Sequence, residues 1–301
     1  MRGTHRVADH GVEGQRRIRR LLQARTRYCH IRYDRINSQW EFEVNQVRLV
    51  VRDDNPRAVG TADMLTGLLA DQGVSIEGTA PSAVVAIGGD GTVLQAASMA
   101  VELGIPVCGV NVGRVGYLAE FAEDEIADLA EAIGTDGFMT RHHSVLSVST
   151  SSASATAIND IVVEKVISQR IIEVAVTVND RPLATYRTDG MIVASPLGST
   201  AYSLSAGGPI VDSSLDVLIL TPIAPHSLLT RAIVLAPDAV VTISVVGDRP
   251  ARINVDGREL CTVAPEEPIN IRRGDATVEF LTLGRHPFPQ AVREQFGLDH
   301  A

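Results

Sequence analysis

The chain changes its residue pattern near Arg141, and this change constrains the fold more than any other feature. Before it, short apolar runs alternate with segments of helical periodicity. After it, short runs rich in β-branched residues follow one another, separated by Gly, Pro, Asn and Asp. Alternating strands and helices predict a parallel sheet covered on both faces. The later pattern predicts an antiparallel, β-rich second domain.

At 301 residues the chain is long enough for two such domains. We expect an open parallel, Rossmann-like α/β domain at residues 46–140 and an antiparallel, β-sandwich-like domain at 141–280. The first domain has expected strands at 47–51, 83–87 and 105–110, and expected helices at 59–71, 93–103 and 123–133. The second has expected strands at 145–148, 171–178, 191–194, 217–220, 232–235, 240–245, 251–255, 269–271 and 278–283, with one helical interruption at 199–205.

Residues 1–45 stand apart because arginines make them basic within an acidic chain. We expect a mobile extension, or a translation start placed too far upstream, with a membrane or nucleic-acid tether as the alternative.

Composition excludes several classes of protein. A net charge of −9 argues against a general nucleic-acid binder. No stretch approaches the roughly 20 apolar residues of a membrane-spanning helix, and no apolar secretory segment follows the start. Cys29, Cys108 and Cys261 are far apart, with none at metal-ligand spacing, so we expect reduced thiols, a cytoplasmic protein and no metal held by the protein alone.

The common nucleotide motifs are also missing. Lys165 is the only lysine and lies between Glu164 and Val166, so the chain has no P-loop. The dinucleotide fingerprint and the usual hydrolase and zinc-protease motifs are absent as well. Any attraction for an anionic nucleotide must therefore be local, from backbone amides and a divalent cation.

The sequence Gly-Gly-Asp-Gly-Thr at 88–92 follows the expected buried strand 83–87 and opens an expected helix. Free N–H groups at such a turn, including those at Gly89, Gly91 and Thr92, favour phosphate. Asp90 would repel an anion, so we expect it to receive a hydroxyl proton or to help organise a metal. This pattern is typical of phosphoryl transfer to an alcohol, while the alternative is a tight turn whose aspartate caps the helix.

Four further segments carry candidate chemistry. Residues 111–118 follow the next strand, so their loop should lie beside Asp90, with Tyr117 lining a ring pocket or simply packing inward. Asn159 and Asp160 suit a ribose or a base edge, but Asn-Asp is also ordinary turn chemistry. Residues 189–209 run from a strand through Pro-Leu-Gly-Ser-Thr to Gly-Gly-Pro, and their small residues favour close approach of a flat ring. Residues 254–259 contain Asp-Gly, a strong hairpin signal.

Taken together and in this order, these motifs resemble those of the NAD kinase family, from about residue 47 to residue 283. The resemblance implies transfer of the ATP γ-phosphate to the 2′-hydroxyl of the adenosine ribose of NAD, with Mg²⁺ and with ATP or polyphosphate as donor. It also implies an α/β domain joined to a β-rich, NAD-binding domain, a C-terminal tail (residues 281–301) that packs back on the first domain, and a homodimer or homotetramer.

The resemblance assigns a role to each matching position. Asp90 would face the reacting hydroxyl and help arrange the Mg²⁺-bound phosphates, and Asp256 would be a second carboxylate near the chemistry. Asn159 and Asp160 would hold the adenosine part of NAD, and Asp189 would lie toward the nicotinamide half. The residues that would surround the adenine are Thr200, Ala201, Tyr202 and Ser205.

Three positions depart from the family pattern. Asp160 replaces a glutamate and is one methylene shorter, Leu197 replaces a threonine, and Tyr117 replaces a phenylalanine. The rival interpretations are a diacylglycerol-type lipid kinase, which shares Gly-Gly-Asp-Gly-Thr but does not predict the Pro-x-Gly-Ser-Thr-Ala-Tyr segment at 196–202, and a catalytically weak nucleotide-binding paralogue. A 6-phosphofructokinase is disfavoured, because its second half should alternate strands and helices.

Overall fold

The computed structural model describes residues 36–39 (backbone only), 44–76, 78–113, 116–135, 137–226 and 228–298. These residues belong to one compact unit. The expected extension at 1–45 lies almost wholly outside them, as do residues 114–115 of the predicted loop and the last three residues of the expected tail.

The first half forms the parallel sheet that its pattern predicts. Strands β2 (Val47–Val51), β3 (Ala83–Gly88) and β4 (Val107–Asn111) pair in parallel, and the two-residue β5 (Phe121–Ala122) pairs with β4. Helices and a 3-10 turn follow these strands: α2 (Pro56–Asp71), α3 (Asp90–Leu103), η1 (Glu123–Glu125) and α4 (Ile126–Gly134).

Both faces of this sheet are covered. Successive side chains of a strand point to opposite faces, so Val85 and Ile87 pack in the cluster that contains residues of α2 and α4. Val84 and Ala86 pack instead in the cluster that contains α3. Burial on both faces explains why β3 is a continuous apolar run rather than an alternating one.

The second half is a sandwich of antiparallel strands. Its elements are β6 (Met139–Ser149), β7 (Ser154–Ala157), β8 (Asp160–Lys165), β9 (Ile172–Val178), β10 (Arg181–Thr188), β11 (Gly190–Ala194), η2 (Leu197–Thr200), α5 (Tyr202–Ser205), β12 (Leu218–Ile223), β13 (Ile233–Leu235), β14 (Val241–Val246), β15 (Ala251–Val255), β16 (Arg258–Val263) and β17 (Ile269–Thr282). One sheet has the order β13-β12-β11-β8-β15-β16. It buries an aliphatic core against β9, β14 and β17, with the fully buried Tyr186 among its members.

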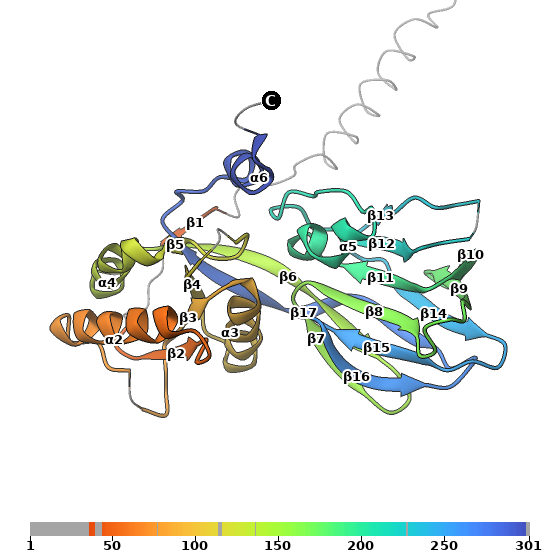
Figure 1. The fold of residues 1–301 in the computed structure, drawn as a ribbon, viewed down its shortest axis with the longest axis horizontal. Helices are drawn as coiled ribbons and strands as arrows, with labels where there is room; N and C mark the ends of the chain where they lie inside the picture. The colour runs from red at the N-terminus through yellow and green to blue at the C-terminus, as the bar shows by residue number, and fades with distance from the viewer. Residues whose placement is uncertain are drawn as a thin grey trace, which may run out of the picture. The chain divides into compact units, whose positions relative to one another are not determined.

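The opposing sheet of the sandwich is continuous with the parallel sheet. Strand β17 pairs with β14 and with β6 in antiparallel fashion, and at Phe280 it pairs in parallel with Val107 of β4. The result is one 11-stranded sheet with the path β10-β9-β14-β17-β4-β3-β2. Strands β6 and β17 run side by side through it (Figure 1), and β1 (Ile36–Gln39) pairs with β6.

The α/β and antiparallel fold classes are thus confirmed, but several element bounds differ from expectation. Helix α2 begins at Pro56 rather than at Val59, because the Asn55 side chain accepts the Arg57 N–H at 3.0 Å and proline suits the first helical position. The runs at 269–271 and 278–283 are one strand, interrupted by a polar irregularity between Arg273 and Thr277. Six strands were not expected, namely β1, β5, β7, β8, β10 and β16. Of these, β1, β5 and β7 are short, and β10 and β16 are mostly exposed or lack a clear apolar alternation. The buried strand β8 was missed because its apolar run covers only Ile161, Val162 and Val163 between charged residues.

The C-terminal segment contacts the first half of the chain. Arg285 forms ion pairs with Glu125 and Asp128, at 2.9 and 2.8 Å. Helix α6 (Phe288–Phe296) places the ring of Phe296 6.1 Å from that of Tyr117.

Candidate active site

The Asp90 side chain does not cap its own helix. Gly89 is the N-cap of α3, and Asp90 is the first helical residue. Its two carboxylate oxygens instead accept the backbone N–H groups of Tyr117 and Leu118, at 3.0 and 3.2 Å. The helix-cap interpretation is therefore wrong, and the loop after β4 lies beside Asp90 as predicted.

Gly116 makes this contact possible. A Cβ at this position would lie 2.1 Å from Oδ1 of Asp90, so any other residue would force the carboxylate out of this position. Gly89 and Gly91 differ, because a Cβ on either would meet nothing within 4 Å. Gly116, in the loop after β4, thus packs against Asp90, whereas Gly89 and Gly91 leave open space beside the turn. Thr92 packs against Gly88.

A second carboxylate organises the start of β8. Asp256 accepts the backbone N–H groups of Ile158, Asn159 and Asp160, at 2.8, 2.7 and 3.1 Å. Asp256 has a φ of 49° and Gly257 has a φ of 77°, so they form the tight turn between β15 and β16 that the Asp-Gly signal predicts. The hairpin interpretation is right, and the carboxylate also contacts a segment distant in sequence.

Burial sets the electrostatics of these two acids. Asp160 is only 5% exposed, and desolvation, aided by the charge of Asp256, raises its pKa to about 7. Desolvation also raises the pKa of Asp256, although the three amide donors and Arg258 oppose that rise. Because Asp256 has those donors, we assign the charge of the pair to Asp256 and the retained proton to Asp160 near neutral pH.

Asn159 presents an acceptor to this region. Its main chain is fully engaged, since its N–H donates to Asp256 and its carbonyl accepts the N–H of Ser195 at 2.8 Å. Its side-chain Oδ1 is buried and has no hydrogen-bond partner among the described residues. An unsatisfied buried acceptor of this kind calls for a ligand donor or a water.

Much of the segment 189–209 is structural rather than open to a ligand. Ser195 donates its hydroxyl to the carbonyl of Ile158 at 2.6 Å, and a Cβ on Gly198 would lie 2.0 Å from the carbonyl oxygen of Asn159. Ser199 and Ser203 are buried and hydrogen-bonded inside the fold. These small residues let the segment close on the Asn159 loop, which the sequence did not reveal.

The predicted adenine-binding residues of this segment differ in exposure. Tyr202 and Ser205 are exposed on α5, while Thr200 and Ala201 are half-buried at the junction of η2 and α5. The Thr200 hydroxyl donates to the Leu197 carbonyl at 3.3 Å. Four of the predicted positions therefore lie in one short stretch, with two side chains facing solvent.

Three acidic side chains act on the pKa of the Tyr202 hydroxyl. Desolvation raises its pKa first, and the charges of Glu164, Asp160 and Asp189 raise it further. Asp189 pairs with Lys165, whose Nζ lies 2.5 Å from Oδ1. Neither the effect of Glu164 nor the pairing of Lys165 with Asp189 was predicted from the sequence. The single lysine of an arginine-rich chain could have marked Lys165 as a residue with a specific partner.

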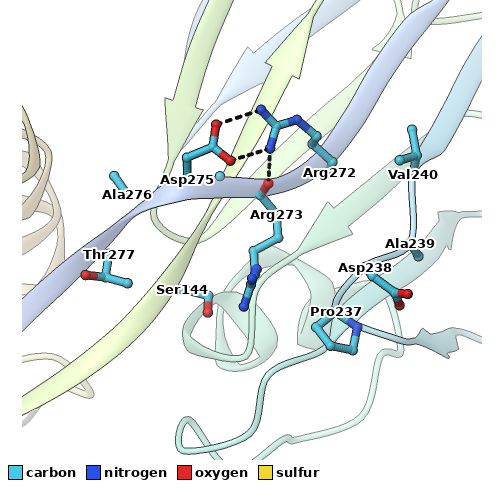
Figure 2. A pocket seen from close by; sticks show the side chains of 11 residues that line it. Ser144, Pro237, Asp238, Ala239, Val240, Arg272, Arg273, Asp275, Ala276 and Thr277 are labelled. Carbon is cyan, nitrogen blue, oxygen red and sulfur yellow. Dashed lines mark hydrogen bonds and ion pairs between the residues drawn. The ribbon is translucent and has the colours of Figure 1, made fainter.

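Two cavities can be compared with the positions of these residues. One, of about 210 Å³, includes Gly91 and Asp256 in its lining. The other, of about 350 Å³, lies at the irregular part of β17 and is lined by none of the predicted site residues (Figure 2). The arginines of the larger cavity are already paired, Arg272 with Asp275 and Arg273 with Asp216. The smaller cavity is therefore the one that belongs to the candidate site.

Within the part of the chain that the structure describes, no helix has the length and apolar character needed to span a membrane.

Comparisons with known proteins agree with this arrangement. A family model described as the ATP-NAD kinase N-terminal domain matches residues 76–138, and one described as the ATP-NAD kinase C-terminal domain matches residues 158–283. An NAD kinase of Heliobacterium modesticaldum is 34% identical over 275 residues, covering 83% of this chain and 97% of that protein. An NAD kinase of Cutibacterium acnes is 34% identical over 223 residues, covering 71% and 70%.

Solved structures resemble the fold. A yeast NADH kinase, solved in complex with NADH, gives a TM-score of 0.79 at 20% identity over 88% of this chain and 92% of that one, which bears on the fold alone. An NAD kinase from Archaeoglobus fulgidus, solved in complex with ATP, gives a TM-score of 0.68 at 26% identity over 84% and 97%. Both halves of the sequence and the fold thus lead to one conclusion: the chain belongs to the NAD kinase family.

Proposed function

We propose that the chain transfers the γ-phosphate of ATP to the 2′-hydroxyl of the adenosine ribose of NAD. The ribose oxygen forms a bond to the γ-phosphorus, the bond to the β,γ-bridging oxygen breaks, and the products are NADP and ADP. The hydroxyl proton passes to a carboxylate. The family of the chain and the ligands named for the two solved relatives, ATP and NADH, support this assignment.

The observation that carries the proposal is the Asp90 carboxylate, held between two backbone N–H groups beside an open glycine turn. A carboxylate has about four lone-pair sites, so two remain for a substrate hydroxyl. A ribose hydroxyl is a poor nucleophile, so we assign to Asp90 the tasks of orienting it and accepting its proton late in the transfer.

We assign the acceptor nucleotide, NAD, to the side of Asp256 on which Asn159, Asp160 and Tyr202 lie. Asn159 offers its unpartnered Oδ1, Asp160 offers a carboxyl that donates when protonated, and Tyr202 supplies an exposed ring for the adenine. Thr200, Ala201 and Ser205 complete the proposed adenine contact, with Asp189 toward the nicotinamide half. Because Asp160 is shorter than the family's glutamate, we expect a longer or water-bridged contact with the ribose.

We assign Mg²⁺ to the phosphates of ATP rather than to a site built by the protein. Among the described residues, no group of three or more His, Cys, Asp or Glu side chains could hold a metal ion. The Asp90 carboxylate keeps lone pairs beyond the two backbone N–H groups that it accepts, so it can also help arrange the Mg²⁺-bound phosphates. The cation would neutralise phosphate charge, and no step of the reaction is assigned to a protein-bound metal.

The test is to incubate the purified chain with Mg²⁺, ATP and NAD and to measure NADP with an NADP-specific dehydrogenase. We expect NADP in amounts equal to the ADP formed, and none when ATP is omitted. Parallel reactions replace NAD with NADH or with dispersed diacylglycerol. Phosphorylated lipid without NADP would establish the rival lipid kinase, and NAD binding without NADP would establish a weak paralogue. The expected homodimer or homotetramer stays a prediction that light scattering tests.

A further inference from the structure

The orientation of the Asp90 carboxylate depends on the loop that follows β4. Its two oxygens accept the backbone N–H groups of Tyr117 and Leu118, at 3.0 and 3.2 Å. Gly116 precedes these residues and leaves the carboxylate its space, since a Cβ there would lie 2.1 Å from Oδ1. Whatever fixes Tyr117 and Leu118 therefore also fixes Asp90.

The two loop residues are held in different ways. Leu118 packs with the apolar cluster that contains residues of α3. The side chain of Tyr117 is not part of that cluster, and its hydroxyl has no hydrogen-bond partner among the described residues. The ring of Tyr117 packs instead against that of Phe296, with the centroids 6.1 Å apart and the planes tilted by 55°. This separation is within the favourable range for aromatic pairs.

Helix α6 carries Phe296 to this position from a fixed base. Just before the helix, the backbone N–H groups of Leu283 and Arg285 donate to the Glu120 carboxylate, at 2.9 and 3.3 Å. The guanidinium of Arg285 also pairs with acidic side chains of η1 and α4. The base of the helix is thus attached to the segment that follows the Tyr117 loop.

The helix has little packing of its own. None of the residues Phe288–Phe296 is buried, and Phe296 itself is 39% exposed. Its nine residues are fewer than the roughly 12–15 that make an isolated helix even marginally stable in water. Attachments at both ends therefore keep α6 in place, and Phe296 makes the attachment at the far end. Because this side chain lies outside the cores, it can be replaced without unfolding the chain.

We infer that Phe296 is a positioning residue for phosphoryl transfer, which acts on Asp90 through Tyr117. Phe296 restrains the ring of Tyr117, the backbone N–H of Tyr117 holds the carboxylate, and the carboxylate orients the ribose hydroxyl. The inference rests on the proposed function for the role of Asp90. A displacement of about 1 Å at a reacting group can lower a rate about 10²-fold, so a contact at this distance from the chemistry can affect turnover.

The first test needs no substrate. Residue-resolved hydrogen exchange of the full chain measures how often the N–H groups of Tyr117 and Leu118 leave the Asp90 carboxylate. We expect Phe296→Ala to speed their exchange about tenfold or more, which is the loss of local protection, and to leave the midpoint of thermal unfolding unchanged. Leu298→Ala, at another exposed apolar residue just beyond the helix, is the matched control and should leave the exchange unchanged.

The second test measures kinetics with Mg²⁺-ATP and NAD. Phe296→Ala should lower kcat about tenfold or more and leave the KM for either substrate within about twofold, because Asp90 acts in the transfer rather than in binding. Phe296→Tyr keeps the ring and should recover most of that loss. Leu298→Ala should keep the kcat of the unmodified chain.

Three results would overturn the inference. These are unchanged exchange at residues 117 and 118 in Phe296→Ala, faster exchange with an unchanged kcat, and a loss of kcat that Phe296→Tyr does not recover. Hydrogen exchange needs no turnover, so it decides whether Phe296 restrains Asp90 whatever the reaction. Absence of NADP from the unmodified chain would be a separate result against the proposed function.

Discussion

At the scale of single residues, Asp90 is the side chain on which the chemistry depends. Its oxygens accept the N–H groups of Tyr117 and Leu118, so its orientation is fixed before any ligand arrives. Asp90→Asn keeps one carbonyl oxygen for one of those amides but cannot accept a proton. We expect kcat to fall by about 10²–10⁴-fold, the usual contribution of a positioned acid or base.

This prediction needs a fold control, because one amide loses its acceptor. Loss of a single hydrogen bond of this kind costs about 1–3 kcal/mol, so the variant should stay folded by circular dichroism. Asp63→Asn, at an exposed position of α2, should keep both activity and stability. Near-normal turnover by Asp90→Asn would remove this carboxylate from the mechanism.

Asp160 predicts a pH dependence of stability. Its pKa is about 7 in the folded chain, against about 3.9 for an unfolded aspartate. Between these values the folded state holds the Asp160 proton more often than the unfolded state does, so the contribution of Asp160 to the free energy of unfolding should fall as the pH rises from about 4 to about 7. Asp160→Asn cannot ionise and should gain stability relative to the unmodified chain by up to about 1.4 kcal/mol per pH unit in this window.

Urea denaturation at several pH values between 4.5 and about 8 measures this difference. Asp63→Asn, at an exposed position of α2, controls for the exchange of one aspartate for asparagine. Parallel stability curves for Asp160→Asn and the unmodified chain would show that Asp160 is ionised throughout, contrary to the prediction.

At the scale of elements, the start of α3 combines a stability cost with an open surface. Gly91 is the second residue of the helix, and a Cβ there would meet no protein atom within 4 Å. Gly91→Ala should therefore raise stability by up to about 1 kcal/mol, the helical preference of alanine over glycine. If phosphate lies on that open side, the added methyl should raise the KM for ATP at least tenfold.

Gly60→Ala in α2 is the matched control, because its Cβ would also meet nothing within 4 Å. This control should raise the midpoint of thermal unfolding by a similar amount and leave the KM for ATP unchanged. A Gly91→Ala enzyme with unaltered ATP kinetics would mean that the open side of the turn is not used by the donor.

The contacts between elements show which parts of the candidate site could be predicted from the sequence. The contact between Asp90 and the loop after β4 was predictable, because the carboxyl ends of adjacent parallel strands lie at one edge of a sheet. The contact of Asp256 with Asn159 was not, because it depends on the pairing of β15 with β8, which are distant in sequence. The same reason hid the closing of Ser195 and Gly198 on the Asn159 loop.

At the scale of the whole molecule, the α/β half and the sandwich half of the described residues share one sheet. The sequence predicted two domains because the residue pattern changes near Arg141, and the fold classes of both are right. A pattern of single strands cannot reveal that β6 and β17 run through both, since β17 reads as two short apolar runs separated by polar residues. Pairing of Phe280 with Val107 is the tertiary contact that joins the sheets.

This shared sheet predicts how the chain unfolds. Separate domains unfold in separate transitions, whereas elements of one core unfold together. Because β17 contributes Ile271 to the sandwich core and Leu281 to the core beneath α2 and α4, neither half can lose its sheet without disturbing the other.

We expect one calorimetric transition whose enthalpy matches the van't Hoff value. Leu65→Ala in α2 and Ile243→Ala in β14 should each lower the midpoint temperature of this single transition, because each reduces the free energy of unfolding by about 2–5 kcal/mol. Two resolved transitions, with each substitution shifting only one, would show that the halves unfold independently despite their common strand.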